Sequence, residues 1–357
     1  MYKYEEIKVV HLEPTQRCQA ACPMCDRNKN GEEDNQHLTY SEIFYEDAVK
    51  IFDQDFIKNL KKMYMCGNLG DPIFAKDCLE IFQYFRKNNN NIQLSMNTNG
   101  GARSKEWWAE IAKTLDYVIF SIDGLEDTNH IYRQNVNWNI LMESVNSFIK
   151  NGGNAVWDFI VFKHNEHQIE KARELAQKLG FKKFVIKKTG RFFSNVRNQG
   201  KDEHDMFYRK EKKVIKIEKP SDIWVNDALK KEKFIIEKFG SLKNYYNLTE
   251  IDCKVKKEKN IFITAEGYVL PCCWTAGRMY KWYHKDYRKE QIWRFIDAIG
   301  KERINAKIYS LKEILDNTDF FENIEKSWSK SSIENGKLEV CAQKCGILFD
   351  QFSSQYL

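Results

Sequence analysis

Short apolar runs alternate with amphipathic stretches along the first half of the chain. Apolar residues recur at helical spacing over residues 40–52, 77–88, 104–114, 138–150 and 166–179. Thr39, Ser104 and Asn165 are candidate N-caps for three of these stretches. The remaining runs have the length and composition of strands, at residues 7–12, 62–67, 92–98, 117–123, 156–162 and 182–188. This alternation predicts an α/β fold with a parallel sheet.

Helical crossovers between parallel strands are compatible with two architectures. One is an open doubly wound sheet and the other is a curved partial barrel. The pattern changes after residue 195. Residues 196–250 are rich in Lys, Glu and Asp and lack the βα alternation, which predicts a charged helical linker between a first domain, 1–195, and a last one, 251–357.

The last part of the chain has its own pattern. The segment KNIFITAEGYVLPCCW predicts two short strands joined by a turn at Glu266 and Gly267. Helical patterns follow over 289–299 and 310–328. We therefore expect a smaller domain of mixed secondary structure after the linker.

Composition narrows the class of protein. The chain has 357 residues, of which 42% are hydrophobic, enough for a sizeable core. No run reaches the roughly 18 apolar residues of a membrane span, and the opening MYKYEEIKVV lacks the apolar centre of a signal peptide. We therefore expect a cytoplasmic protein without a membrane partner. The 57 Lys and Arg and 51 Asp and Glu residues mix in short runs without a basic stripe, so a nucleic-acid partner is not supported.

The ten cysteines fall mostly into two groups, which in a large chain without an export signal favours metal or cluster binding over disulfides. In the first group, three and then two residues separate Cys18, Cys22 and Cys25, directly after the first predicted strand. Iron-sulfur clusters usually take four thiolates, so three would leave one iron open to a substrate or cofactor. The alternatives are a zinc site completed by His11 or His37, or three buried cysteines.

This spacing at the end of a first strand resembles the signature of the radical S-adenosylmethionine (radical SAM) superfamily. The resemblance implies a [4Fe-4S] cluster on the loop, with its fourth iron chelated by the amino and carboxylate groups of S-adenosylmethionine. It also implies a partial (β/α)6 TIM-like barrel with its active site at the carboxyl ends of the strands, followed by a smaller iron-sulfur domain.

Further motifs at the ends of the next predicted strands extend the resemblance. CGNLGDP, at 66–72, resembles the glycine-rich segment that contacts the methionine amino group. MNTNG, at 96–100, and SIDG, at 121–124, resemble segments that hold the ribose hydroxyls and the methionine carboxylate, for which an arginine fork is well suited. Singly, each motif is more typical of an ordinary turn or cap. The implied S-adenosylmethionine contacts are Met24, Gly67, Asn68, Gly70, Thr98, Asn99, Ser121, Asp123, Arg133 and Val161.

The second cysteine group resembles the SPASM and twitch domains, which carry auxiliary [4Fe-4S] clusters. The carboxyl-terminal region has too few cysteines for two complete clusters. The resemblance therefore implies one auxiliary [4Fe-4S] cluster, held by Cys253, Cys272, Cys341 and Cys345. Cys273 is the expected spare, although the choice between the two adjacent cysteines stays open, and a four-cysteine zinc site is an alternative. Cys66 and Cys78 match no ligand pattern and are interpreted as core residues.

The resemblance implies an enzyme that reductively cleaves S-adenosylmethionine to a 5'-deoxyadenosyl radical, which abstracts hydrogen from a substrate. Cys18, Cys22 and Cys25 are then the catalytic residues, and an electron donor such as flavodoxin or ferredoxin is required. Many SPASM and twitch relatives modify peptides or proteins, so a peptide substrate is expected first. The alternatives are a small molecule, sugar or nucleotide as substrate, or a non-catalytic zinc or iron-sulfur binding module.

Overall fold

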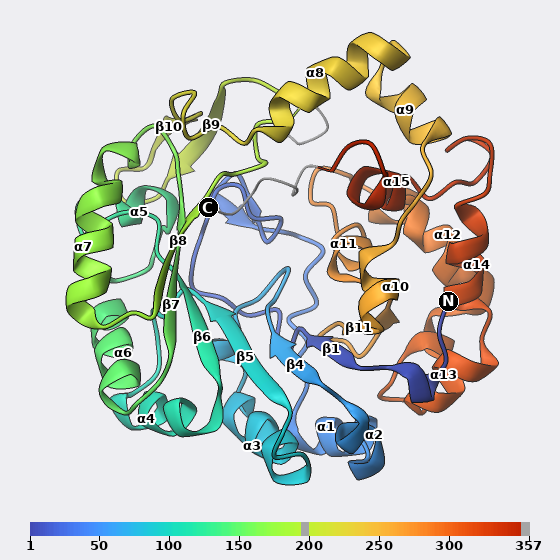
Figure 1. Ribbon diagram of the computed structural model, residues 1–357, viewed down its shortest axis with the longest axis horizontal. Coiled ribbons are helices and arrows are strands. Elements are labelled where there is room, and N and C mark those ends of the chain that lie inside the picture. Colours follow the sequence, from blue (N-terminus) through green and yellow to red (C-terminus); the bar gives the residue numbers. More distant parts are fainter. Residues whose placement is uncertain (194–199, 351–357) are drawn as a thin grey trace.

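The computed structural model describes residues 1–193 and 200–350 of the chain. Its centre is an eight-stranded sheet with the order β12-β11-β1-β4-β5-β6-β7-β8, which curves without closing (Figure 1). Neighbouring strands from β1 to β8 are parallel. These strands are β1 (Val9–Leu12), β4 (Lys62–Met65), β5 (Gln93–Thr98), β6 (Tyr117–Ser121), β7 (Ala155–Ile160) and β8 (Lys183–Lys187). Five lie within the predicted runs and β7 begins one residue before its run, so the expected α/β fold and its six strands are confirmed.

Helices that connect these strands cover the outer face of the curved sheet (Figure 1). They are α1 (Tyr45–Ile51), α2 (Gln54–Asn59), α3 (Cys78–Asn88), α4 (Lys105–Thr114), α5 (Asn129–Tyr132), α6 (Trp138–Lys150) and α7 (Ile169–Leu179). Ser104 caps α4 as predicted, because its side chain accepts a hydrogen bond from the backbone N–H of Trp107. The prediction for Thr39 was wrong, because α1 begins only at Tyr45 and the Thr39 hydroxyl instead contacts Gln16. Asn165 precedes a short 3-10 helix, η3 (Glu166–Gln168), rather than α7 itself.

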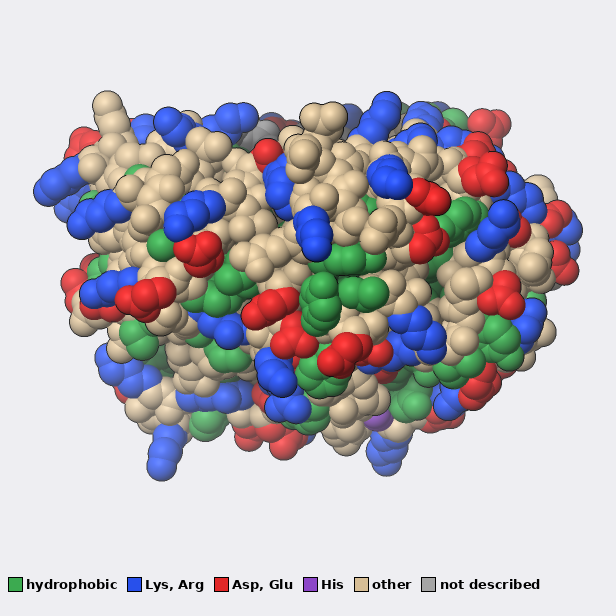
Figure 2. All heavy atoms as spheres, turned by 90° about the horizontal axis from the view of Figure 1, so that it is seen from below, with side chains coloured by type: hydrophobic (Ala, Val, Ile, Leu, Met, Phe, Trp, Pro, Cys, Tyr) green, Lys and Arg blue, Asp and Glu red, His purple; other side chains and the backbone are tan. Residues whose placement is uncertain are grey.

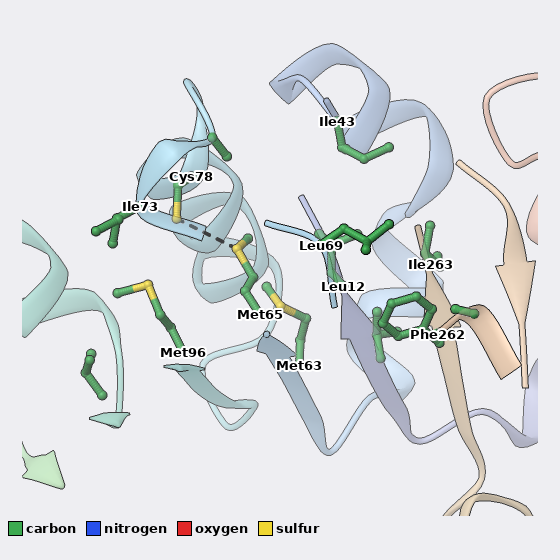
Figure 3. Close-up of a cluster of buried hydrophobic side chains, with 14 of the residues drawn as sticks. Leu12, Ile43, Met63, Met65, Leu69, Ile73, Cys78, Met96, Phe262 and Ile263 are labelled. Carbon is green, nitrogen blue, oxygen red and sulfur yellow. Dashed lines mark hydrogen bonds between the residues drawn. The ribbon is translucent and has the colours of Figure 1, made fainter. Parts of the chain in front are cut away.

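Strand alternation separates an apolar outer face of the sheet from a polar inner one. Figure 3 shows outward side chains of neighbouring strands, Leu12, Met65 and Met96 among them, gathered with residues of the surrounding loops and helices. All three are fully buried. Cys78 belongs to this layer, with its sulfur 3.7 Å from the Met65 sulfur, so its interpretation as a core residue is confirmed. The positions between these outward residues therefore face the interior of the barrel.

The predicted carboxyl-terminal hairpin extends the barrel sheet. β11 (Asn260–Ile263) pairs in parallel with β1, and β12 (Val269–Leu270) returns antiparallel to β11. The turn lies where the sequence predicts it, with Gly267 at a φ of 98°, a left-handed conformation that favours glycine. Its docking beside β1 was not indicated by the sequence pattern. One continuous core consequently includes apolar residues from both ends of the chain.

Residues 200–259 form an arch that leads to the carboxyl-terminal helices (Figure 1). The arch contains a hairpin that the sequence did not indicate, β9 (Glu203–Tyr208) with β10 (Lys213–Glu218), followed by α8 (Ala228–Phe239) and α9 (Leu242–Leu248). The predicted helix over 310–328 is divided into two. The carboxyl-terminal helices are α10 (Lys254–Glu258), α11 (Cys273–Ala276), α12 (Gln291–Ile299), α13 (Leu311–Asn317), α14 (Phe320–Ser327) and α15 (Glu339–Cys345).

Small elements complete the described structure. They are the strands β2 (Asn28–Lys29) and β3 (Glu33–Asp34) and the 3-10 helices η1 (Tyr4–Glu6), η2 (Pro72–Phe74), η4 (Tyr287–Lys289) and η5 (Lys301–Ile304). On the face shown in Figure 2, basic and acidic side chains are interspersed rather than segregated. Among residues 1–193 and 200–350, no helix has both the length and the apolar character needed to cross a membrane.

Candidate active site

The first cysteine group lines a cavity of about 360 Å³ at the carboxyl end of the parallel strands. Cys18, Cys22 and Cys25 reach it from the loop that follows β1, and the ends of β4, β5, β6, β7 and β8 supply other parts of the wall. The carboxyl ends of parallel barrel strands are the usual location of an active site. The structure therefore brings the three predicted cysteines together at the expected edge of the sheet.

Polar side chains at the ends of the strands make much of the cavity wall polar. Asp158 of β7 lies between Trp157 and Phe159, which are both buried in the core. Because successive residues of a strand face opposite sides, Asp158 points into the barrel, where it lines the cavity together with its register partner Ser121 of β6. A charged residue in the middle of an apolar strand was the sequence signal that could have identified Asp158.

Hydrogen-bond donors approach the sulfur of Cys18 from two directions. The backbone N–H of Ala20 lies 3.3 Å from it and Nδ2 of Asn99 lies 3.6 Å from it. Burial raises the pKa of the Cys18 thiol, and it raises the pKa of Cys25 to about 11. Without a metal these thiols are protonated at neutral pH, so binding iron would release protons.

An arginine lies next to Cys22 and is paired with an aspartate. Nη1 of Arg133 lies 3.9 Å from the Cys22 sulfur, and Nε of Arg133 donates to Oδ2 of Asp123 at 2.6 Å. The other oxygen of Asp123 accepts a 2.7 Å hydrogen bond from the backbone N–H of Ile160. Burial raises the pKa of the Cys22 thiol, while the guanidinium of Arg133 lowers it. Asp123 thus fixes Arg133 so that its positive charge faces a cysteine sulfur.

The glycines of the loop that follows β4, the glycine-rich loop, allow it to pack closely against the loop that follows β1. A Cβ atom on Gly70 would lie 1.9 Å from the carbonyl oxygen of Thr15, and one on Gly67 would lie 2.3 Å from the carbonyl oxygen of Gly70. Glu13 of the loop after β1 holds the same segment, because its carboxylate accepts hydrogen bonds from the backbone N–H groups of Leu69 and Gly70. The glycine-rich loop is therefore anchored against the loop that carries the cysteines.

Asp71 connects the glycine-rich loop after β4 to the carboxyl end of β5. Its carboxylate accepts a 2.8 Å hydrogen bond from the Thr98 hydroxyl and bonds of 2.8 and 2.7 Å from the backbone and side-chain N–H groups of Asn99. Asp71 is buried and also lines the cavity. Asp71 lies within the CGNLGDP motif but was not among the predicted site residues. It holds Asn99 in the position from which that side chain reaches Cys18.

Most of the predicted S-adenosylmethionine contacts line the cavity. These are Met24, Gly67, Asn68, Gly70, Thr98, Asn99, Ser121 and Arg133. Asp123 does not line the cavity and is paired with Arg133. Val161 is buried in the core, because Ile160, one residue earlier, is the residue that faces the cavity. Cys66 also lines the cavity, so its interpretation as a core residue was wrong. Other lining residues that the sequence analysis missed include Asn97, Tyr132, Lys187 and Arg191.

The second cysteine group lines a separate, small cavity. Cys253 and Cys272 precede the first turns of α10 and α11, and Cys341 and Cys345 lie one turn apart on α15, a spacing that places them on one face of the helix. A hydrogen bond between Cys253 and Cys345 raises the pKa of the first thiol and lowers that of the second. Cys273 does not line this cavity.

An indole group also borders the second cavity. Trp328 lines this cavity with its indole Nε1 buried beside the Cys341 thiol. Burial raises the pKa of the Cys341 thiol, the neighbouring Cys272 and Cys345 raise it further, and the approach of Trp328 lowers it. Within the described ranges, no three Cys, His, Asp or Glu side chains are grouped so that they could hold a metal ion. The cysteines of both groups surround cavities instead of meeting at one point.

Comparisons with known proteins agree with this architecture. The model of the radical SAM superfamily matches residues 12–176, and no curated protein sequence matches the chain. Streptococcus suis SuiB bound to S-adenosylmethionine is 15% identical, with 95% of this chain and 73% of that chain covered and a TM-score of 0.55. The structure of anSMEcpe with bound AdoMet is 12% identical, with 95% and 86% covered and a TM-score of 0.54. SuiB has also been solved bound to its precursor peptide SuiA.

At these identities the solved structures establish the fold, and the family model accounts for the first site. That model covers the loop with Cys18, Cys22 and Cys25 and the strand ends as far as β7. The family implies a [4Fe-4S] cluster and S-adenosylmethionine. Residues 12–176, which carry the first site, therefore match the radical SAM superfamily, and the chain shares the fold of solved radical SAM structures.

Proposed function

We propose that this enzyme cleaves S-adenosylmethionine reductively and modifies a residue of a peptide or protein. In this proposal Cys18, Cys22 and Cys25 hold the [4Fe-4S] cluster that binds S-adenosylmethionine. The observation that carries the proposal is that these cysteines share one cavity with the polar ends of the β4 to β7 strands. An auxiliary [4Fe-4S] cluster is held by Cys253, Cys272, Cys341 and Cys345.

The residues around the first site fit a cluster with one open corner. Three thiols line the cavity, and N–H donors from Ala20, Asn99 and Arg133 approach the sulfurs of Cys18 and Cys22. Hydrogen bonds and positive charge at such sulfurs stabilise thiolate ligands and tune the potential of a cluster. When bound, the reduced cluster supplies the electron that cleaves S-adenosylmethionine and so generates the radical that abstracts hydrogen from the substrate.

The protein's own part is to position the bound molecules. Asp71 fixes Thr98 and Asn99, and Asp123 fixes Arg133, so the polar groups at the strand ends are held before any ligand binds. Such preorganisation spares the cost of ordering these side chains on binding. The loops around the cavity also shield the reacting atoms from water, which would otherwise allow side reactions. Electrons reach the site from an external donor, for which flavodoxin or ferredoxin is suitable.

We assign a cluster rather than a zinc ion to the second site because residues 12–176 match a family that binds a [4Fe-4S] cluster. Its four thiols line one cavity. The buried N–H of Trp328 lies beside the Cys341 thiol and is available to a sulfur atom at this site. Cys272 lines the cavity and Cys273 does not, which favours Cys272 as the ligand.

The likeness to SuiB supports the peptide substrate. It extends over 95% of this chain and therefore includes the carboxyl-terminal part as well as the barrel. The test is to add peptides encoded beside the gene to the reduced enzyme and to follow 5'-deoxyadenosine and peptide mass together. A peptide-dependent rise in 5'-deoxyadenosine with a change in peptide mass is expected. Stimulation by a small molecule alone would contradict the peptide assignment.

Anaerobic reconstitution tests the two clusters. We expect about eight irons per chain, four in each cluster, and formation of 5'-deoxyadenosine after reduction. Replacing Cys18, Cys22 and Cys25 together by Ala is expected to abolish cleavage and leave about four irons at the second site. Full cleavage activity in this variant would contradict the assignment of the first site, and bound zinc in place of the remaining iron would contradict that of the second.

A further inference from the structure

Arg191, which follows β8, carries a hydrogen-bond donor that no neighbouring group satisfies. The residue lines the cavity that also holds Cys18, Cys22 and Cys25. Its Nη1 donates to the Thr189 hydroxyl at 3.1 Å, while its Nε is buried without a hydrogen-bond partner among residues 1–193 and 200–350. A buried donor without a partner is costly and is rare in native structures. Nε of Arg191, like Nε of Arg27 on the same wall, is therefore a donor that a bound group could satisfy.

The other cations of the cavity wall each have a carboxylate partner. Arg27 pairs with Asp34 at 2.7 Å, Arg133 with Asp123 at 2.6 Å, and Lys187 with Asp158 at 3.3 Å. Among the residues that the structure describes, no carboxylate lies within ion-pair distance of Arg191. A partly buried charge is normally paired. Arg191 thus lacks the kind of partner that its neighbours possess, which points to a negatively charged group.

A second unsatisfied donor belongs to the side chain next to Arg191. The hydroxyl of Tyr132 is buried and has no hydrogen-bond partner in the described part of the chain, and Tyr132 also lines the cavity. The guanidinium of Arg191 lies 5.4 Å from the centre of the Tyr132 ring. An arginine and a phenol offer one positive charge and several N–H and O–H donors. A carboxylate has one negative charge and two acceptor oxygens, and so matches this pair.

We propose that Arg191, together with the hydroxyl of Tyr132, is a carboxylate-binding subsite of the cavity. The inference rests on the proposed function, because the cavity is taken to hold both S-adenosylmethionine and a substrate. The carboxylate comes either from the methionine part of S-adenosylmethionine or from an acidic residue of a peptide. The chemistry of recognition is the same for both sources.

Equilibrium binding to the reconstituted full-length enzyme tests the subsite and separates the two sources. The first pair of probes is S-adenosylmethionine and its decarboxylated analogue. The second pair is a capped alanine pentapeptide with one central glutamate and the same peptide with glutamine, each added to the enzyme in the presence of S-adenosylmethionine. Dissociation constants are compared for the wild type and for Arg191→Gln. Arg173→Gln is the control, because Arg173 carries the same charge on the exposed surface of α7.

Two patterns support the proposal. A weakening of S-adenosylmethionine by about tenfold or more, without an equal weakening of the decarboxylated analogue, assigns the subsite to the methionine carboxylate. An unchanged affinity for S-adenosylmethionine, with weakened binding of the glutamate peptide alone, assigns it to the substrate. Arg191→Lys is expected to lie between wild type and Arg191→Gln, because lysine keeps the charge and loses the fork. Tyr132→Phe is expected to give a smaller loss in the same direction.

Any other pattern overturns the proposal. Unchanged affinities for all probes mean that Arg191 binds no carboxylate. Equal losses for the acidic and neutral members of both pairs mean that the substitution has damaged the cavity in general. A failure of the proposed function is distinguishable, because it appears in the wild type as an absence of 5'-deoxyadenosine and does not depend on Arg191.

Discussion

The side-chain amide of Asn68 donates a 2.7 Å hydrogen bond to the carbonyl oxygen of Cys273. Asn68 belongs to the glycine-rich loop of the first cavity, and Cys273 is the first residue of α11. The bond therefore connects the walls of the two cavities that the cysteines line. It holds the backbone at the position where the side chains of the adjacent Cys272 and Cys273 point to different surroundings. Cys272 lines the second cavity, whereas Cys273 lies near Cys66. Burial raises the pKa of the Cys273 thiol, and the neighbouring Cys272 and Cys66 raise it further.

This divergence predicts different iron contents for two neighbouring substitutions. Cys272→Ala is expected to lose about four irons, the content of one cluster, while the cluster at the first site is retained. Cys273→Ala is the matched control and is expected to keep the full iron content. Iron and sulfide analysis of both variants after anaerobic reconstitution measures the difference. The reverse result would identify Cys273 as the ligand.

Loss of the Asp123 carboxylate is expected to destabilise the protein and to weaken cleavage of S-adenosylmethionine. Its side chain is fully buried and that of Arg133 is 15% exposed. Asp123→Asn leaves the arginine charge buried without its partner, which costs about 3 to 5 kcal/mol. Urea unfolding of the cluster-free protein measures this loss. Asp55→Asn, in an exposed pair with Lys58, is the control and is expected to cost less than about 1 kcal/mol.

A methyl group on Gly70 is expected to separate the two loops of the first site. The added Cβ would lie 1.9 Å from the Thr15 carbonyl oxygen, so the backbone must move. We expect Gly70→Ala to lose affinity for S-adenosylmethionine and iron at the first site, with the second site still filled. Gly152→Ala is the control, because no atom lies within 4 Å of its Cβ position. It is expected to lose only about 1 to 2 kcal/mol from its left-handed backbone. Equal iron contents in both variants would contradict the expected role of this close contact.

Glu13 is expected to make stability fall as the pH rises. Burial raises its pKa to about 7, from an ordinary value of 4.5, against the opposing effect of the backbone N–H of Leu69. Between these two values the folded protein keeps a proton that the unfolded chain has lost, so the free energy of unfolding decreases with increasing pH. The stabilisation is complete below about pH 4.5 and is lost by about pH 7. It amounts to about 3 kcal/mol at 1.36 kcal/mol per pKa unit.

The comparison with Glu13→Gln isolates this contribution. Glutamine keeps the acceptor oxygen for the N–H groups of Leu69 and Gly70 but does not titrate. Urea unfolding at several pH values between 4.5 and 7 is expected to show a steeper decline for the wild type than for the variant. Parallel curves would mean that the pKa of Glu13 is not raised in the folded protein.

Local pattern was sufficient for the elements of the barrel. The six strands and most of the intervening helices appear where the periodicity of 2 or 3.6 residues predicts them, and the three cysteines of the first loop share a cavity because they are close in sequence. The exact start of α1 was not predicted, because Thr39 satisfies Gln16 in a turn and leaves the helix to begin after Phe44. Asp158 was detectable as a charge within an apolar strand.

The amino-acid sequence by itself determined the α/β alternation, the two groups of cysteines and the resemblance of residues 12–176 to radical SAM enzymes, since all three depend on residue type and short spacing. Tertiary structure decided which of two adjacent cysteines enters the second cavity, that β11 extends the sheet beside β1, and that Arg191 faces the cavity without a carboxylate. These features depend on which distant segments pack together. Spacing along the chain does not encode them, because they arise from the direction of each side chain in the folded protein.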